Sequence, residues 1–162
     1  MDAGPLLALI DRGQGEVQRT CVAFLKAISG PLVTTWPCFT EGMYFLGDLK
    51  GWNGQEALWR FIERGAFPVH VSTDSETERM GVPMEKYSDA PMELADASLV
   101  AIAETHGLHS IFTLDGDFRV YRINGTTPFE LVRRARRREG VREIRRERGK
   151  ADPAHDVMAE AG

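Results

Sequence analysis

The chain contains few cysteines and no long hydrophobic run. Only Cys21 and Cys38 occur among its 162 residues, and its start, Met-Asp-Ala-Gly-Pro, lacks the basic residues of a signal peptide. Two cysteines without an export signal are typical of reduced, structural thiols in the cytoplasm. No apolar stretch approaches the roughly 20 residues that a membrane-spanning helix needs. We therefore expect a cytoplasmic protein with no membrane segment.

Several catalytic patterns are also missing. No Ser–His–Asp or Cys–His arrangement is evident, which argues against nucleophilic catalysis by a serine or a cysteine. The histidines lack the spacing of metal-ligand pairs, so we expect core or surface roles for His70, His106, His109 and His155. We expect the three tryptophans in the core, although an exposed Trp52 would be a candidate for stacking on bases.

The charge is divided unevenly along the chain. Residues 1–132 carry 18 acidic and 10 basic side chains, whereas residues 133–150 carry 3 acidic and 10 basic ones. The hydrophobic content of 43% is enough for a packed core. We therefore predict one domain over residues 1–132 and a charged tail over 133–162. An acidic domain repels phosphates except where a cation or local bases intervene.

The basic part of the tail has its own pattern. Glu139, Glu143 and Glu147 recur every four residues among arginines, which favours a charged helix with internal ion pairs. Almost no apolar stripe accompanies them. A solvated helix and an RNA-capturing segment are both compatible with this composition.

Helical and extended patterns alternate along residues 1–132. The periodicity of apolar residues predicts helices over 5–12, 16–28, 41–49, 53–64, 73–87 and 94–106, and strands over 32–35, 69–71, 110–114 and 120–123. Thr73 and Glu76 have the spacing of a capping box, and Gly107 is a plausible helix stop. Alternation of this kind predicts an α/β sandwich around a mostly parallel sheet.

Four acidic residues lie beside apolar runs: Asp2, Glu41, Asp96 and Asp115. If the runs form one core, the carboxylates gather at one edge, beyond the carboxyl ends of the strands. Carboxylates in one pocket repel each other, and their oxygens suit Mg²⁺ or Mn²⁺. Taken singly, Glu41 and Asp96 also fit acids placed near a positive helix start, and residues 113–117 fit an ordinary Asp/Gly turn.

Four segments in this order resemble a PIN-domain ribonuclease of the VapC type, the toxin of a type II toxin–antitoxin system. They are DAGPLLALID at 2–11, TTWPCFTE at 34–41, MELADASLVAIAE at 92–104 and FTLDGDF at 112–118. The resemblance covers about residues 2–132. It implies a three-layer α/β/α sandwich, a Mg²⁺ or Mn²⁺ cofactor, cleavage of single-stranded or structured RNA, a cognate antitoxin and a homodimer.

The resemblance also assigns roles to single residues. Asp2, Glu41, Asp96 and Asp115 match the family's acidic site, where they would hold the metal and support catalysis. Thr113 and Asp117 match flanking positions of the last motif. Glu93 shares a helical face with Asp96 by spacing, so it either holds water on the metal or is simply solvated.

The chain departs from the family at its start. The family's first acidic residue ends a buried strand, whereas only Met1 precedes Asp2 here. We therefore expect the first strand to be truncated, or the start to be wrongly assigned, and Asp2 to lie on a mobile terminus.

This departure supports an alternative function, an inactive PIN-like module that only binds an antitoxin or RNA. A phosphorylated receiver domain would need paired acids after the first strand and a lysine after a late strand. The chain has neither pattern.

Overall fold

The computed structural model describes residues 1–28, 30–89 and 92–132. The helices there are α1 (Ala3–Ile10), α2 (Glu16–Ala27), α3 (Trp36–Lys50), α4 (Trp52–Glu63), α5 (Asp74–Lys86) and α6 (Leu94–His106). The strands are β1 (Thr34–Thr35), β2 (Val69–His70), β3 (Ser110–Phe112), β4 (Arg122–Ile123), β5 (Thr127–Pro128) and β6 (Glu130–Val132). Two short 3₁₀ turns, Arg12–Gln14 and Asp117–Arg119, connect them.

The strands pair in three short ladders. β1 runs parallel to β2, with Thr34 opposite Val69, and β3 runs parallel to β6, with Ile111 opposite Leu131. β4 and β5 form an antiparallel hairpin. The predicted α/β fold with parallel strand pairing is confirmed.

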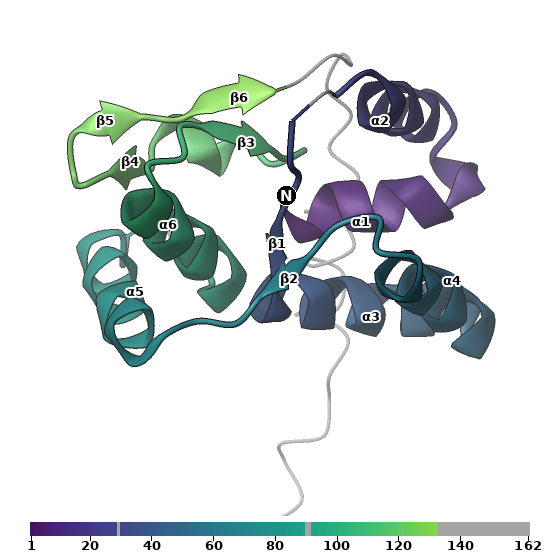
Figure 1. Cartoon of the computed structure of the whole chain (residues 1–162), viewed down its shortest axis with the longest axis horizontal. Coiled ribbons are helices and arrows are strands. Elements are labelled where there is room, and N and C mark those ends of the chain that lie inside the picture. Colours follow the sequence, from purple (N-terminus) through teal and green to yellow (C-terminus); the bar gives the residue numbers. More distant parts are fainter. Residues whose placement is uncertain (29, 90–91, 133–162) are drawn as a thin grey trace, which may run out of the picture.

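The chain start connects the two parallel ladders. The Met1 nitrogen donates to the Val33 carbonyl at 2.5 Å, and the Thr34 hydroxyl donates to the Met1 carbonyl at 2.7 Å. On the other side, the Asp2 N–H donates to the Phe112 carbonyl at 3.0 Å. Figure 1 shows the N-terminus in this position, between β1 and β3. The expectation of a mobile terminus is wrong, because both residues are buried and hydrogen-bonded to neighbouring strands.

Helices cover both sides of these strands. In Figure 1, α5 and α6 lie on one side and α1, α2 and α4 on the other. α3 packs against both α4 and α6 and so joins the two groups. One buried cluster includes Val100, Ile111, Phe118 and Tyr121, and a second includes Leu6, Phe39, Leu46, Leu58 and Phe67. Burial of these apolar side chains is the main stabilising contribution.

Local sequence explains how several helices begin and end. The Thr73–Glu76 capping box forms at the start of α5 as predicted. α6 ends at Gly107, which has a left-handed backbone at φ 63° that glycine adopts without strain. Thr35 is the N-cap of α3, and Pro37 follows in the first turn, where a missing N–H costs nothing.

Some expectations about the elements are wrong. Asn53 does not cap α4, which begins at Trp52 after Gly51. The tryptophans are not core residues, because Trp36, Trp52 and Trp59 are 41%, 66% and 41% exposed. The sequence pattern also missed β5 and β6.

The tail at 133–162 lies outside the described residues, and so do the charged helix and the RNA capture considered for it. Among the residues that the structure covers, no helix has the length and apolar character needed to cross a membrane.

Candidate active site

Asp2 is held at the centre of the fold. It is the N-cap of α1 and is 6% exposed. Its Oδ1 accepts from the Ala3 N–H at 2.6 Å, and its Oδ2 accepts from the Thr113 hydroxyl at 2.6 Å. Burial raises the pKa of Asp2, while these hydrogen bonds lower it and the charge of Asp115 raises it. Both oxygens therefore have fixed directions, as a metal ligand requires.

Asp96 lies in the first turn of α6 and is 8% exposed. Burial is the largest effect on this carboxyl, and the neighbouring charge of Asp2 adds to it, raising the pKa of Asp96 to about 8. The charges of Asp115 and Glu41 raise it further. The Glu93 N–H donates to Oδ2 at 3.3 Å and opposes the shift.

Asp115 follows β3 at the carboxyl end of the strand. Its N–H donates to the Thr113 hydroxyl at 2.9 Å, and its Oδ1 accepts from the Asp117 N–H at 2.9 Å. Thr113 is fully buried and so connects the backbone of Asp115 with the carboxylate of Asp2. Asp115 is half-buried, and its charge acts on both Asp2 and Asp96.

Glu41 approaches the same region from α3 and is half-buried. Its charge acts on Asp96 and on the thiol of Cys38. Burial raises the pKa of Cys38 to about 12, and the charges of Asp2 and Glu41 contribute, so this thiol stays protonated and is no nucleophile. The Cys38 Sγ instead donates to the Ala95 carbonyl at 3.5 Å.

The predicted acids are therefore coupled through Asp96, on which the charges of Asp2, Asp115 and Glu41 all act. They come from the N-cap of α1, from α3, from α6 and from the segment after β3. A concentration of negative charge with little water around it favours a bound cation. The donor set is all oxygen, which fits Mg²⁺ or Mn²⁺ better than a soft metal. The residues present thus fit the divalent metal that the sequence analysis expects.

The chain also matches a solved structure. It resembles the crystal structure of Mycobacterium tuberculosis VapC20, which is described as a sarcin–ricin loop cleaving toxin. The TM-score is 0.68, and the match covers 74% of this chain and 91% of that chain. This chain has the PIN-domain fold.

Sequence identity with that toxin is only 17%, so the likeness concerns the fold. No family model matches this chain, and no curated protein matches it either. The predicted fold is confirmed, and the roles of single residues stay predictions.

Three residues around the acids donate hydrogen bonds to their carboxylates, one from a side chain and two from the backbone. Thr113 donates to Asp2, and the backbone N–H groups of Glu93 and Asp117 donate to Asp96 and Asp115. The Glu93 side chain is exposed, so its position matches the solvated interpretation as well as a role near a metal.

Sequence reasoning missed a polar pair beneath the acids. The Ser98 hydroxyl lies 2.6 Å from the Thr35 hydroxyl and 2.6 Å from the Ala95 carbonyl, joining α6 to the start of α3. Ser98 is two residues after Asp96, but only the fold places it against Thr35. The pair fixes α6, and therefore Asp96, relative to α3, which carries Glu41.

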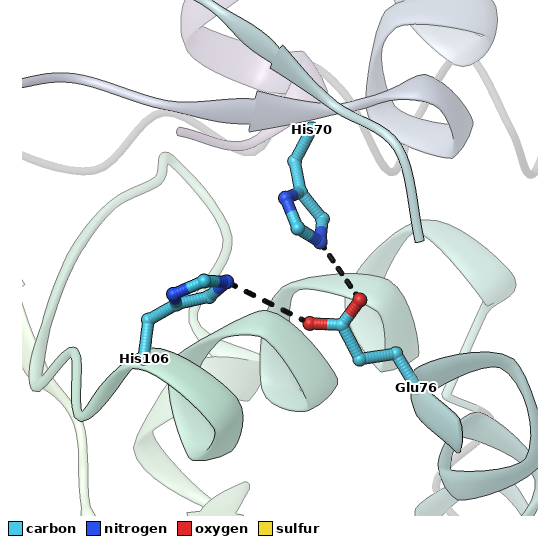
Figure 2. Close-up of side chains that lie close together, drawn as sticks. All are labelled: His70, Glu76 and His106. Carbon is cyan, nitrogen blue, oxygen red and sulfur yellow. Dashed lines mark hydrogen bonds and ion pairs between the residues drawn. The ribbon is translucent and has the colours of Figure 1, made fainter. Parts of the chain in front are cut away.

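Two of the histidines lie close to an acidic side chain that the sequence does not connect with them. His70 and His106 are far apart in the sequence, yet both face the carboxylate of Glu76 (Figure 2). No pattern in the sequence links His70, Glu76 and His106, because only the fold brings them together.

Proposed function

We propose that this PIN domain is a Mg²⁺-dependent endoribonuclease, the toxin of a toxin–antitoxin pair. The observation that carries the proposal is the carboxylate cluster of buried Asp2 and Asp96 with half-buried Asp115 and Glu41 beside them. Buried acids that raise one another's pKa values are costly to a fold, so they are typical of functional sites.

The four acids would hold the metal in this proposal. When bound, one or two Mg²⁺ ions supply a bound water of lowered pKa and stabilise charge on the phosphate oxygens. The Thr113 hydroxyl and the Asp117 N–H orient the oxygens of Asp2 and Asp115. Such outer hydrogen bonds keep ligand positions close to those that catalysis needs.

A groove beside Glu41 fits the RNA strand. Its volume is about 580 Å³, and it is lined by Trp36, Pro37, Thr40, Glu41, Tyr44, Glu93, Leu94 and Ala95. Trp36 is 41% exposed and Tyr44 57%. Exposed aromatic rings stack on the bases of single-stranded RNA, and each stacked base contributes about 1–3 kcal/mol. We propose that this groove receives an unpaired base next to the scissile phosphate.

The toxin proposal includes partners. The VapC-type resemblance implies a cognate antitoxin and a homodimer. An RNA substrate implies that the protein functions in the cytoplasm. An apolar groove of about 690 Å³ between α2, β3 and β6 offers the antitoxin a hydrophobic surface that includes Phe24, Phe112 and Leu131. Co-expression with the protein of an adjacent gene should relieve growth arrest caused by the chain alone, and unchanged arrest would count against that partner.

RNA cleavage tests the enzymatic proposal. Purified protein should cleave a structured RNA when Mg²⁺ is present and stop when a chelator is added. Asp96→Asn should lower the rate by at least about 100-fold, because loss of an outer hydrogen-bond partner of a metal site alone costs 10–100-fold. The matched control is Asp89→Asn, which changes an exposed acid that is not one of the four and should cleave as the wild type does.

Equal cleavage by the wild type and Asp96→Asn would overturn the proposal. The alternative of an inactive module was motivated by the missing first strand. Asp2 is nonetheless buried and hydrogen-bonded, so the missing strand does not leave this acid without support. That alternative still predicts no Mg²⁺-dependent cleavage by any variant.

A further inference from the structure

A second cluster of metal-ligating side chains lies at the other end of α6. It consists of His70 on β2, Glu76 in the first turn of α5 and His106 in the last turn of α6 (Figure 2). One ligand atom from each lies within 4.8 Å of the others. Asp96 is ten residues from His106 along α6, which corresponds to roughly 15 Å of helix. The cluster is therefore separate from the acidic site.

The two oxygens of Glu76 differ in their surroundings. Oε2 accepts from the Thr73 N–H at 2.8 Å and lies 2.8 Å from His70 Nε2. Oε1 is buried, and among the described residues no donor meets both the distance and the angle of a hydrogen bond to it. The Thr105 side chain is near enough to Glu76 to help lower its pKa, but its geometry does not make it a full hydrogen-bond partner of Oε1. It faces His106 Nε2 at 3.8 Å, too long for a hydrogen bond.

A buried oxygen of this kind is costly. Glu76 is only 2% exposed, and an unsatisfied buried acceptor costs free energy. Burial raises the pKa of Glu76, but interactions with His70, Thr73 and Thr105 outweigh burial and lower it to about 2. The carboxylate therefore carries its charge at neutral pH, with Oε2 against His70 and Oε1 facing His106. A cation between these side chains would satisfy Oε1.

We propose that His70, Glu76 and His106 bind a Zn²⁺ ion. Two imidazole nitrogens and one carboxylate oxygen are a donor set that zinc uses in proteins, with a fourth position left for water. At zinc–ligand distances of about 2.0–2.1 Å, tetrahedral ligand atoms lie roughly 3.3 Å apart. The ligand atoms now lie within 4.8 Å of one another, so side-chain rotations that move each atom by no more than about 1.5 Å bring them to that spacing. His106 is 51% exposed in its side chain, which leaves it free to make this movement.

Zinc binding requires a defined proton change. A ring nitrogen that binds the metal cannot keep its proton, so a proton on Nε2 of His70 or His106 must leave to solvent or be carried on Nδ1 instead. Glu76 is already ionised and releases none. Thr73 continues to donate to Oε2, which fixes the carboxylate direction.

The bound ion would connect three elements. β2, α5 and α6 would share one ligand set, and β2 is the strand that pairs with β1. We infer a stabilising role for the zinc, because the cluster stands apart from the acidic site.

Zinc titration of chelator-treated protein tests the proposal. Excess Mg²⁺ is present throughout, so that the acidic cluster is occupied. The wild type should bind one equivalent of Zn²⁺, and His106→Ala should weaken the affinity by about 100-fold or more, since loss of an outer partner alone costs 10–100-fold. His109→Ala, which changes a neighbouring exposed histidine outside the cluster, should bind as the wild type does.

Two further measurements separate the sites and control for folding. Asp96→Asn should keep the full zinc affinity while losing RNA cleavage. The zinc proposal and the ribonuclease proposal can therefore fail independently, and the two failures can be told apart. Co²⁺ in place of Zn²⁺ should give the visible absorption bands of tetrahedral coordination in the wild type, and His70→Ala and Glu76→Gln should lose them while circular dichroism remains native.

Three results would overturn the zinc site. They are no saturable Zn²⁺ binding in the presence of Mg²⁺, equal affinity in the wild type and His106→Ala, and loss of Zn²⁺ binding in Asp96→Asn.

Discussion

The hydroxyl group of Thr113 forms hydrogen bonds with two of the four acidic residues. It donates to the Asp2 carboxylate at 2.6 Å and accepts from the Asp115 N–H at 2.9 Å, so it joins two of the four acids. The family resemblance marks this position, whereas residue patterns alone would leave it as a buried strand residue. The hydrogen bonds explain why a threonine, rather than a valine of the same shape, suits this place.

Replacing Thr113 should weaken cleavage without removing it. Thr113→Val keeps the volume but leaves Asp2 Oδ2 without its donor, so we expect a rate lower by roughly 10–100-fold. Thr113→Ser keeps the hydroxyl and should retain most of the activity. Single-turnover cleavage of the same RNA compares them. Equal rates for Thr113→Val and the wild type would mean that the hydrogen bond does not position Asp2 for catalysis.

Asp96 predicts a pH dependence of stability. Its pKa rises from 3.8 to about 8 in the folded protein, so the folded state keeps a proton that the unfolded state releases. In the metal-free protein, the contribution of Asp96 to the free energy of unfolding is therefore fully present below about pH 4. It is lost as the pH rises through about 8, and the total loss is on the order of a few kcal/mol. Glu76 acts the opposite way, but only as pH falls from 4.5 to about 2.

Urea unfolding with a chelator at about pH 5 and pH 8 measures this effect. The wild type should be less stable at the higher pH, and Asp96→Asn should show a smaller difference. Asp2, whose pKa burial also raises, keeps part of the slope in both proteins. A pH difference unchanged by Asp96→Asn would show that Asp96 is not the group responsible.

At the scale of elements, α3 and α4 approach closely through a glycine. A Cβ on Gly54 would lie 2.9 Å from the Leu46 carbonyl oxygen and 2.9 Å from the Lys50 Cβ. Only hydrogen fits there without a shift of the two helices. α3 carries Glu41, so this packing also positions the acidic site.

Two alanine substitutions test the close approach. Gly54→Ala should destabilise the protein by about 1–3 kcal/mol through overpacking. Gly81→Ala in α5, where a Cβ meets nothing within 4 Å, should instead stabilise it by about 0.5–1 kcal/mol because alanine favours helix. Urea unfolding measures both. Stabilisation by both substitutions would mean that α3 and α4 are not packed as described.

The helices were more predictable than the strands. Apolar periodicity and the Thr73–Glu76 capping box indicate α2, α5 and α6 within a few residues of their observed ends. β1 and β2 have two residues each, too short for an alternating pattern. Glu130–Val132 becomes a strand only because β3 lies beside it, a long-range contact that local sequence does not indicate.

At the scale of the whole molecule, the meeting of the acids depends on chain order. Each acid adjoins an apolar run, and a mostly parallel sheet brings the ends of such runs to one edge. The sequence therefore predicts a common acidic region and leaves its geometry open. The His70–Glu76–His106 cluster was unpredictable, because it depends on how β2 and the end of α6 pack around α5.

The central claim is that Asp2, Glu41, Asp96 and Asp115 share a bound cation. Calorimetric titration of metal-free protein with Mn²⁺ tests it most directly, with His106→Ala as the control that leaves the acidic cluster intact. We predict saturable binding to the wild type and to His106→Ala, and a loss of at least about 100-fold in affinity in Asp96→Asn. Equal Mn²⁺ affinity in the wild type and Asp96→Asn would contradict the account.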